Sequence, residues 1–84
     1  MNITEALNNL QALTTDHLAY LWTETNTRAC ATTARAWVTR WCNARATVSD
    51  ELSRRGYTLR VVGGYRYAVK TEVAARIDRG EPWL

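Results

Sequence analysis

Apolar residues recur at helical spacing through the first third of the chain. Asn2 followed by Glu5 has the form of a helix cap, and residues 14–16 form a second start signal of the same kind. We therefore expect helices within residues 2–25, ending at a break near Asn26 and Thr27. The apolar positions on which these helices depend are Ile3, Ala6, Leu7, Leu10, Leu13, Leu18, Leu21 and Trp22.

Residues 27–55 contain neither proline nor glycine, so periodicity alone permits one long helix there. The alternative is two helices separated by a turn near residues 42–44. We favour the turn because threonine is abundant and weak in helix interiors, and because residues 47–50 have the form of a helix start. Trp37 and Trp41 are one turn apart, and we expect them to pack as a core seam.

The next segment alternates in the manner of strands. Residues 57–62 and 65–70 flank Gly63 and Gly64, a pair that suits a tight turn with positive φ at both central residues. Residues 71–79 then have the pattern of a short last helix, ended by Gly80 and Pro82. The predicted class is mainly α with a small β-hairpin, in a single domain spanning residues 1–84. The apolar tail at Trp83 and Leu84 would fold back on the core or meet a partner.

Composition narrows the function classes. The chain has 84 residues, of which 46% are hydrophobic and 23% charged, so it is expected to form one globular domain with a limited core. No apolar run reaches the length of a membrane span and no signal peptide is evident, so we expect a cytoplasmic protein without a membrane partner.

Catalysis and metal binding have little support in the sequence. Cys30 and Cys42 are expected to be buried as small apolar side chains, and His17 is the single histidine. We find no nucleophile motif, phosphate loop or pair of catalytic carboxylates. The sequence therefore predicts a protein that binds, with no enzymatic activity, metal or cofactor.

Positive charge is concentrated in the middle of the chain. Residues 28–70 carry nine bases and two acids, whereas residues 1–27 carry three acids and no base, and the whole chain has a net charge of +3. A cationic segment of this kind is typical of a protein with a polyanionic partner.

Residues 42–52, Cys-Asn-Ala-Arg-Ala-Thr-Val-Ser-Asp-Glu-Leu, resemble the turn and recognition helix of bacterial and phage helix-turn-helix repressors. The pattern of that family runs roughly G-V-S-x-x-T-V-S-x-x-L, and it has glycine where Cys42 stands and serine or threonine where Ala44 stands. The hairpin that follows resembles the wing of a winged helix. The resemblance covers roughly residues 33–70, with the helix-turn-helix at about 33–55, the wing at 57–70 and the last helix at 71–79.

The resemblance implies a winged helix-turn-helix fold that places one helix in the major groove of double-stranded DNA. Arg45 would read base edges, Arg66 would hold the backbone or minor groove beside the wing tip, and Val48 and Leu52 would face inward. The DNA-contacting set implied in this way is Arg35, Arg40, Arg45, Ala46, Thr47, Ser49, Ser53, Arg54, Arg55, Arg60 and Arg66.

Two function classes stay open. The first is a small prokaryotic or phage regulator or architectural protein that binds DNA, with a homodimer as the expected means of enlarging its footprint. The second is a phage-type inhibitor that binds a host protein partner through the same scaffold. Asp50 and Glu51 favour the second class unless they pair with Arg54 or Arg55, because carboxylates repel phosphates.

Overall fold

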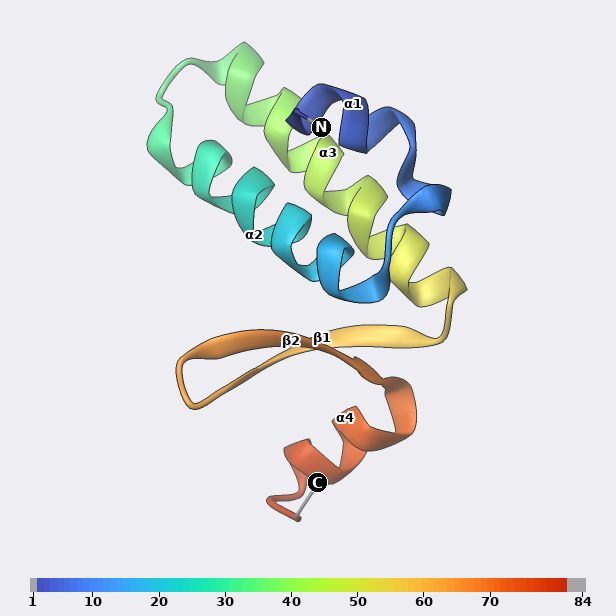
Figure 1. Cartoon of the computed structure of the whole chain (residues 1–84). Helices are drawn as coiled ribbons and strands as arrows, with labels where there is room; N and C mark the ends of the chain where they lie inside the picture. The colour runs from blue at the N-terminus through green and yellow to red at the C-terminus, as the bar shows by residue number, and fades with distance from the viewer. Residues whose placement is uncertain (1, 82–84) are drawn as a thin grey trace.

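The computed structural model describes residues 2–81 and is mainly helical with one β-hairpin (Figure 1). This confirms the predicted fold class, and the arrangement is compatible with a winged-helix-like fold. The elements in chain order are α1 (Ile3–Asn8), the short 3-10 helix η1 (Leu10–Ala12), α2 (Thr15–Ala31), α3 (Arg35–Arg54), β1 (Tyr57–Val62), β2 (Tyr65–Lys70) and α4 (Thr71–Asp78).

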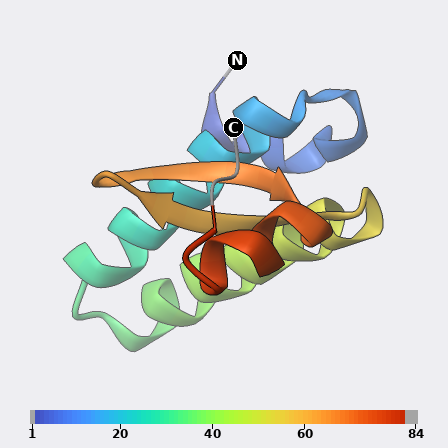
Figure 2. The same ribbon diagram turned by 90° about the horizontal axis from the view of Figure 1, so that it is seen from below.

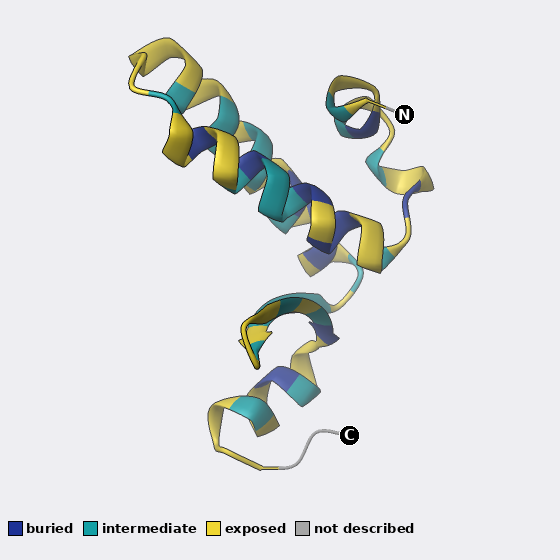
Figure 3. Ribbon diagram, turned by 60° about the vertical axis from the view of Figure 1, so that its left-hand side comes forward, coloured by how far each residue is buried: buried dark blue, intermediate teal, exposed yellow. Residues whose placement is uncertain are grey.

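The elements form three layers. Helices α2 and α3 lie side by side, the hairpin lies against one side of this pair, and α4 covers the other face of the hairpin (Figures 1 and 2). The core fills the space between α2, α3 and α1, and its buried members are Ala6, Leu13, Leu18, Leu21, Val48 and Leu52. Tyr57, Leu59 and Ala68 of the hairpin pack against this core, which Figure 3 shows in dark blue between the long helices.

The predicted helix starts are confirmed. The Asn2 side chain accepts a hydrogen bond from the Glu5 N–H at 2.8 Å, and the Thr14 hydroxyl accepts one from the His17 N–H at 3.1 Å. Each satisfies a backbone donor that the first turn of a helix leaves without a partner.

The break predicted at Asn26 and Thr27 is wrong, because α2 continues to Ala31. Threonine hydroxyl groups on both sides of the expected break are satisfied inside the helix. Thr25 donates to the Leu21 and Trp22 carbonyls, and Thr27 donates to the Thr23 carbonyl at 3.0 Å.

The turn predicted at residues 42–44 is also wrong, because α3 runs without interruption from Arg35 to Arg54. Cys42 and Ala44 replace the glycine and hydroxyl residues that would favour a turn, and the Thr47 hydroxyl donates to the Asn43 carbonyl at 2.9 Å instead of capping a new helix. The alternative of one helix is therefore correct for residues 35–54, although this helix begins eight residues later than Thr27.

Two predictions of burial also need correction. Trp37 is 49% exposed and Trp41 is half-buried, because both lie in the first two turns of α3, toward the free end of the helix pair. The contact with α2 is instead made by Val48 and Leu52, which are buried as predicted. Cys30 is exposed rather than buried, and Cys42 is half-buried; both are free thiols.

The predicted hairpin is confirmed in position and register. Strands β1 and β2 are antiparallel, with Tyr57 opposite Lys70 and Val62 opposite Tyr65. Gly63 and Gly64 have φ values of +61° and +84°, the region that a two-residue primed turn needs and that glycine adopts most easily. Helix α4 ends one residue before the predicted boundary, and the tail from Pro82 to Leu84 lies outside the described residues.

Replacing Leu52 by alanine should destabilise the fold by about 2–5 kcal/mol, because the side chain is 1% exposed and its loss leaves a cavity between α2 and α3. Thr39→Ala is the control on the exposed face of α3 and should change the stability by less than about 0.5 kcal/mol. Urea unfolding followed by circular dichroism measures both. Equal midpoints for Leu52→Ala and the parent would show that this contact is not part of the core.

Candidate nucleic-acid interface

Arg45, predicted to read bases, lies in the middle of α3 and is held by α2. One guanidinium nitrogen, Nη1, donates to Asn26 Oδ1 at 2.6 Å, and the guanidinium carbon lies 5.6 Å from the centre of the Trp22 ring. A helix start at this position would have left Arg45 exposed. In the continuous helix it instead spans the contact between the two long helices.

Trp22 is the point at which α2, α3 and the hairpin meet. Its indole N–H donates to the Ser49 hydroxyl at 2.8 Å, and the guanidinium of Arg66 on β2 stacks on its ring at 4.4 Å. Arg66 also donates to the Thr23 hydroxyl at 3.0 Å. Ser49 and Arg66, both predicted to contact DNA, are therefore engaged in joining the layers.

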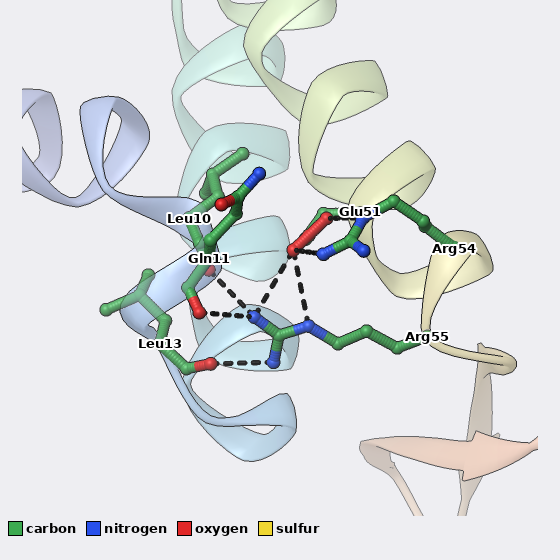
Figure 4. A network of polar contacts seen from close by, with 6 residues as sticks. All are labelled: Leu10, Gln11, Leu13, Glu51, Arg54 and Arg55. Atoms are coloured by element: carbon green, nitrogen blue, oxygen red, sulfur yellow. Dashed lines mark hydrogen bonds and ion pairs between the residues drawn. The ribbon is translucent and has the colours of Figure 1, made fainter.

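Arg54 and Arg55 surround one nearly buried carboxylate. Glu51 accepts hydrogen bonds from Arg54 at 2.6 and 2.7 Å and from Arg55 at 3.3 Å (Figure 4). Arg55 also donates to the carbonyl of Leu13 at 2.6 Å and to that of Leu10 at 2.9 Å. Glu51 is thus paired, which is one of the arrangements that the DNA interpretation tolerates, whereas Asp50 is exposed without an ion pair to a described residue. Arg55 also holds the segment between α1 and α2.

The ionisation of Glu51 follows from this pairing. The hydrogen bond from Arg54 is the largest cause that lowers its pKa below the ordinary value, with further help from the positive charges of Arg54 and Arg55, while burial opposes the shift. A carboxyl group with a lowered folded-state pKa stabilises the fold at neutral pH and loses that contribution as the pH falls through its folded pKa.

Arg60 is also paired within the fold. Its guanidinium makes two hydrogen bonds to the Asp78 carboxylate of α4, at 2.9 and 3.0 Å. The hydrogen bond from Arg60 lowers the pKa of Asp78. Of the eleven predicted contact residues, those exposed and without an ion pair in the described part of the chain are Arg35, Arg40, Ala46, Thr47 and Ser53.

A second cluster gathers where α2 ends and α3 begins. Arg40 stacks on Trp37 at 5.2 Å and on Trp41 at 5.9 Å, and Arg28 of α2 stacks on Trp41 at 5.2 Å. We call Arg28, Arg35, Trp37, Arg40 and Trp41 the Arg–Trp end. Figure 3 shows the loop at this end, between the two long helices, mainly in the colour of exposed residues.

The nearest acid in the sequence to the Arg–Trp end is Glu24, one helical turn before Arg28 on α2, and both residues line the same pocket. Residues 25–49 contain four arginines and no aspartate or glutamate. Helix α3 begins here without a side-chain cap and without an acidic residue in its first turn, so its positive dipole end is not neutralised by its own side chains. This surface therefore presents positive charge beside a half-exposed indole.

Arg28 was missed as a candidate by the sequence analysis. The contact of Arg28 with Trp41 joins different helices, so no local spacing indicates it. The i, i+3 spacing of Trp37 and Arg40, by contrast, is a signal that could have been used.

Residues 2–81 contain no group of three or more histidine, cysteine, aspartate or glutamate side chains placed to hold a metal ion. No helix within this described range combines the length and the apolar character needed to cross a membrane. No protein-family model matches the chain, and no curated protein or solved structure is found to be similar to it.

Replacing Glu51 by glutamine should lower the melting temperature at neutral pH, because it removes the charge that holds Arg54 and Arg55. The difference from the parent should narrow as the pH falls below the ordinary glutamate value of 4.5 and on through the lower folded-state pKa of Glu51, because the parent carboxyl is then protonated as well.

Thermal melts between pH 7 and pH 3 measure the effect. Glu72→Gln removes an exposed carboxylate that has no ion pair with a described residue, and it should melt close to the parent at each pH. If Glu51→Gln lowered the melting temperature by the same amount at every pH, the charge of Glu51 would not have the stabilising role assigned to it.

Proposed function

We propose that this chain binds double-stranded DNA through the Arg–Trp end, contacting mainly the phosphate backbone. The observation that carries the proposal is the stretch from residue 25 to residue 49, which has four arginines and no acids. Three of these arginines, Arg28, Arg35 and Arg40, lie at the end of the molecule where α2 leads into α3. Backbone contacts by arginine account for most of the sequence-independent affinity of DNA-binding proteins.

The side chains of this end support phosphate contact in two ways. Arg35 makes no ion pair or hydrogen bond through its side chain to a described residue, so its guanidinium is available to a ligand. Arg40 is exposed but stacked on two indoles, which limits the freedom that it would lose on binding.

Specific base reading by Arg45 and Ser49 forms no part of this proposal. Both side chains are held by Asn26 and Trp22, and exposing them would require breaking the contact between α2, α3 and the hairpin. The DNA binding that the geometry supports is therefore of an architectural type in a small cytoplasmic protein. A homodimer would double its footprint.

The protein-binding alternative is supported by a different surface, the groove beside β2 that is described in the next subsection. DNA binding is preferred as the main function because it uses the most concentrated charge on the chain.

Changing Arg35 and Arg40 together to glutamine should weaken binding to a random-sequence duplex. It should also flatten the plot of log affinity against log salt by about two units, or about 0.9 per lost phosphate contact. The measurement is a titration of labelled duplex by fluorescence anisotropy between 50 and about 200 mM salt.

The single changes Arg35→Gln and Arg40→Gln are measured as well, and Arg76→Gln on α4 is their matched control, because it removes one positive charge from an exposed position in the opposite layer. Arg76→Gln should leave the slope of log affinity against log salt almost unchanged. The proposal fails if the parent binds no duplex at low salt, or if Arg76→Gln weakens binding as much as Arg35→Gln or Arg40→Gln does.

A further inference from the structure

The outer edge of β2 carries backbone groups that point away from β1. The Thr71 N–H donates to the Gly56 carbonyl at 3.2 Å, which makes residues 56 and 71 a hydrogen-bonded pair of the antiparallel ladder. Such pairs alternate along the ladder with pairs that turn their groups outward. The N–H and C=O groups of Arg66 and Ala68 therefore face the outside of the hairpin.

The two edges of the hairpin differ. On β1, the Leu59 carbonyl accepts a hydrogen bond from Arg60 Nη1 at 2.8 Å, and Arg60 is fixed in turn by Asp78. On β2, no hydrogen bond to a described residue satisfies the outward groups of Arg66 and Ala68, and within residues 2–81 the sheet has no third strand beside them (Figure 2). Among the described residues, the edge of β1 is partly blocked and the edge of β2 is left open.

A groove of about 670 Å³ runs between the open edge of β2 and helix α2. Its α2 wall includes Ala19, Tyr20 and Thr23, and its hairpin side includes Tyr65 and Ala68. Tyr20 is 62% exposed and Tyr65 is 70% exposed, so apolar ring surface flanks the unpaired backbone.

We infer that this groove binds an extended peptide segment of another protein, which adds to β2 as a third strand. The unpaired edge needs a partner with alternating N–H and C=O groups, which an extended backbone supplies and a globular surface or a nucleic acid does not. Successive peptide side chains would point alternately toward α2 and toward the Tyr65 side of the sheet.

A second copy of the chain fits this edge less well than a peptide does. In a second copy the same edge of β2 is flanked by its own α2, so pairing of the two edges would bring both helices into one groove. Its β1 edge is partly occupied by Arg60. The guanidinium of Arg66 is engaged with Trp22 and Thr23, and Asp16 also lines the groove, so the groove combines an unpaired backbone edge and aromatic rings with one charge of each sign.

The test begins with an octapeptide selected from a random displayed library against the full chain and then synthesised. Amide hydrogen exchange by NMR should show new protection at Arg66 and Ala68 when the peptide is added, while the outward amides of Leu59 and Val61 on β1 stay unchanged. Tyr20→Ala should weaken peptide binding several-fold. Trp37→Ala removes an exposed aromatic side chain outside the groove and should leave peptide binding unchanged.

Two N-methylated forms of the peptide supply the sharper control. Methylation of one alternate set of amides should lower the affinity about tenfold or more, since it removes the hydrogen bonds to β2. Methylation of the other set, whose N–H groups point away from β2, should leave most of the affinity.

The inference fails if no selected peptide protects Arg66 and Ala68, or if both methylated forms bind alike. It fails as well if the two amides become protected only with increasing protein concentration, which would identify a second copy as the occupant, or only with duplex DNA. The inference is independent of DNA binding at the Arg–Trp end, so Arg35→Gln should not alter peptide affinity.

Discussion

The guanidinium of Arg55 joins the C-terminal end of α3 to carbonyl groups that lie 42 and 45 residues earlier in the chain. It binds carbonyl groups of the segment between α1 and α2 from the C-terminal end of α3, and it does so while paired with Glu51. Backbone carbonyl groups of an irregular segment need hydrogen-bond donors when they are buried. The charged guanidinium of Arg55 provides such donors, and hydrogen bonds from a charged donor are short and strong. This contact ties the segment that follows α1 to the point at which the chain leaves α3 for the hairpin.

Features controlled by neighbouring residues could be predicted from the sequence. The caps at Asn2 and Thr14 and the turn at Gly63 and Gly64 each depend on a few adjacent positions, and the structure has them where expected. The continuity of α3 was not predictable in the same way. Threonine has a weak intrinsic preference for helix, but the packing of Val48 and Leu52 against α2 outweighs that preference.

The roles of the arginines were the hardest part to predict, because their partners lie far along the chain. Arg45 meets Asn26, and Arg66 meets Trp22 and Thr23, through contacts that no local spacing reveals. A surplus of positive charge in the sequence indicated a polyanionic partner, yet several of the charges that produced it serve as internal donors. Arg35 and Arg40, which remain available to a ligand, lie in the N-terminal part of α3, whereas the segment that resembled a recognition helix, residues 42–52, lies in its C-terminal part.

The layered arrangement also bears on how the fold comes apart. Helix α4 packs on the hairpin, with Ala74 buried there and Arg60 bound to Asp78, and it lies on the far side of the sheet from the main core (Figure 1). A layer held by so little apolar surface opens locally at a lower free energy than the helix pair beneath it. We therefore expect the face of the sheet that carries Val69 to become accessible while the long helices remain folded. Unfolding of the chain would then begin at α4 and reach the helix pair last.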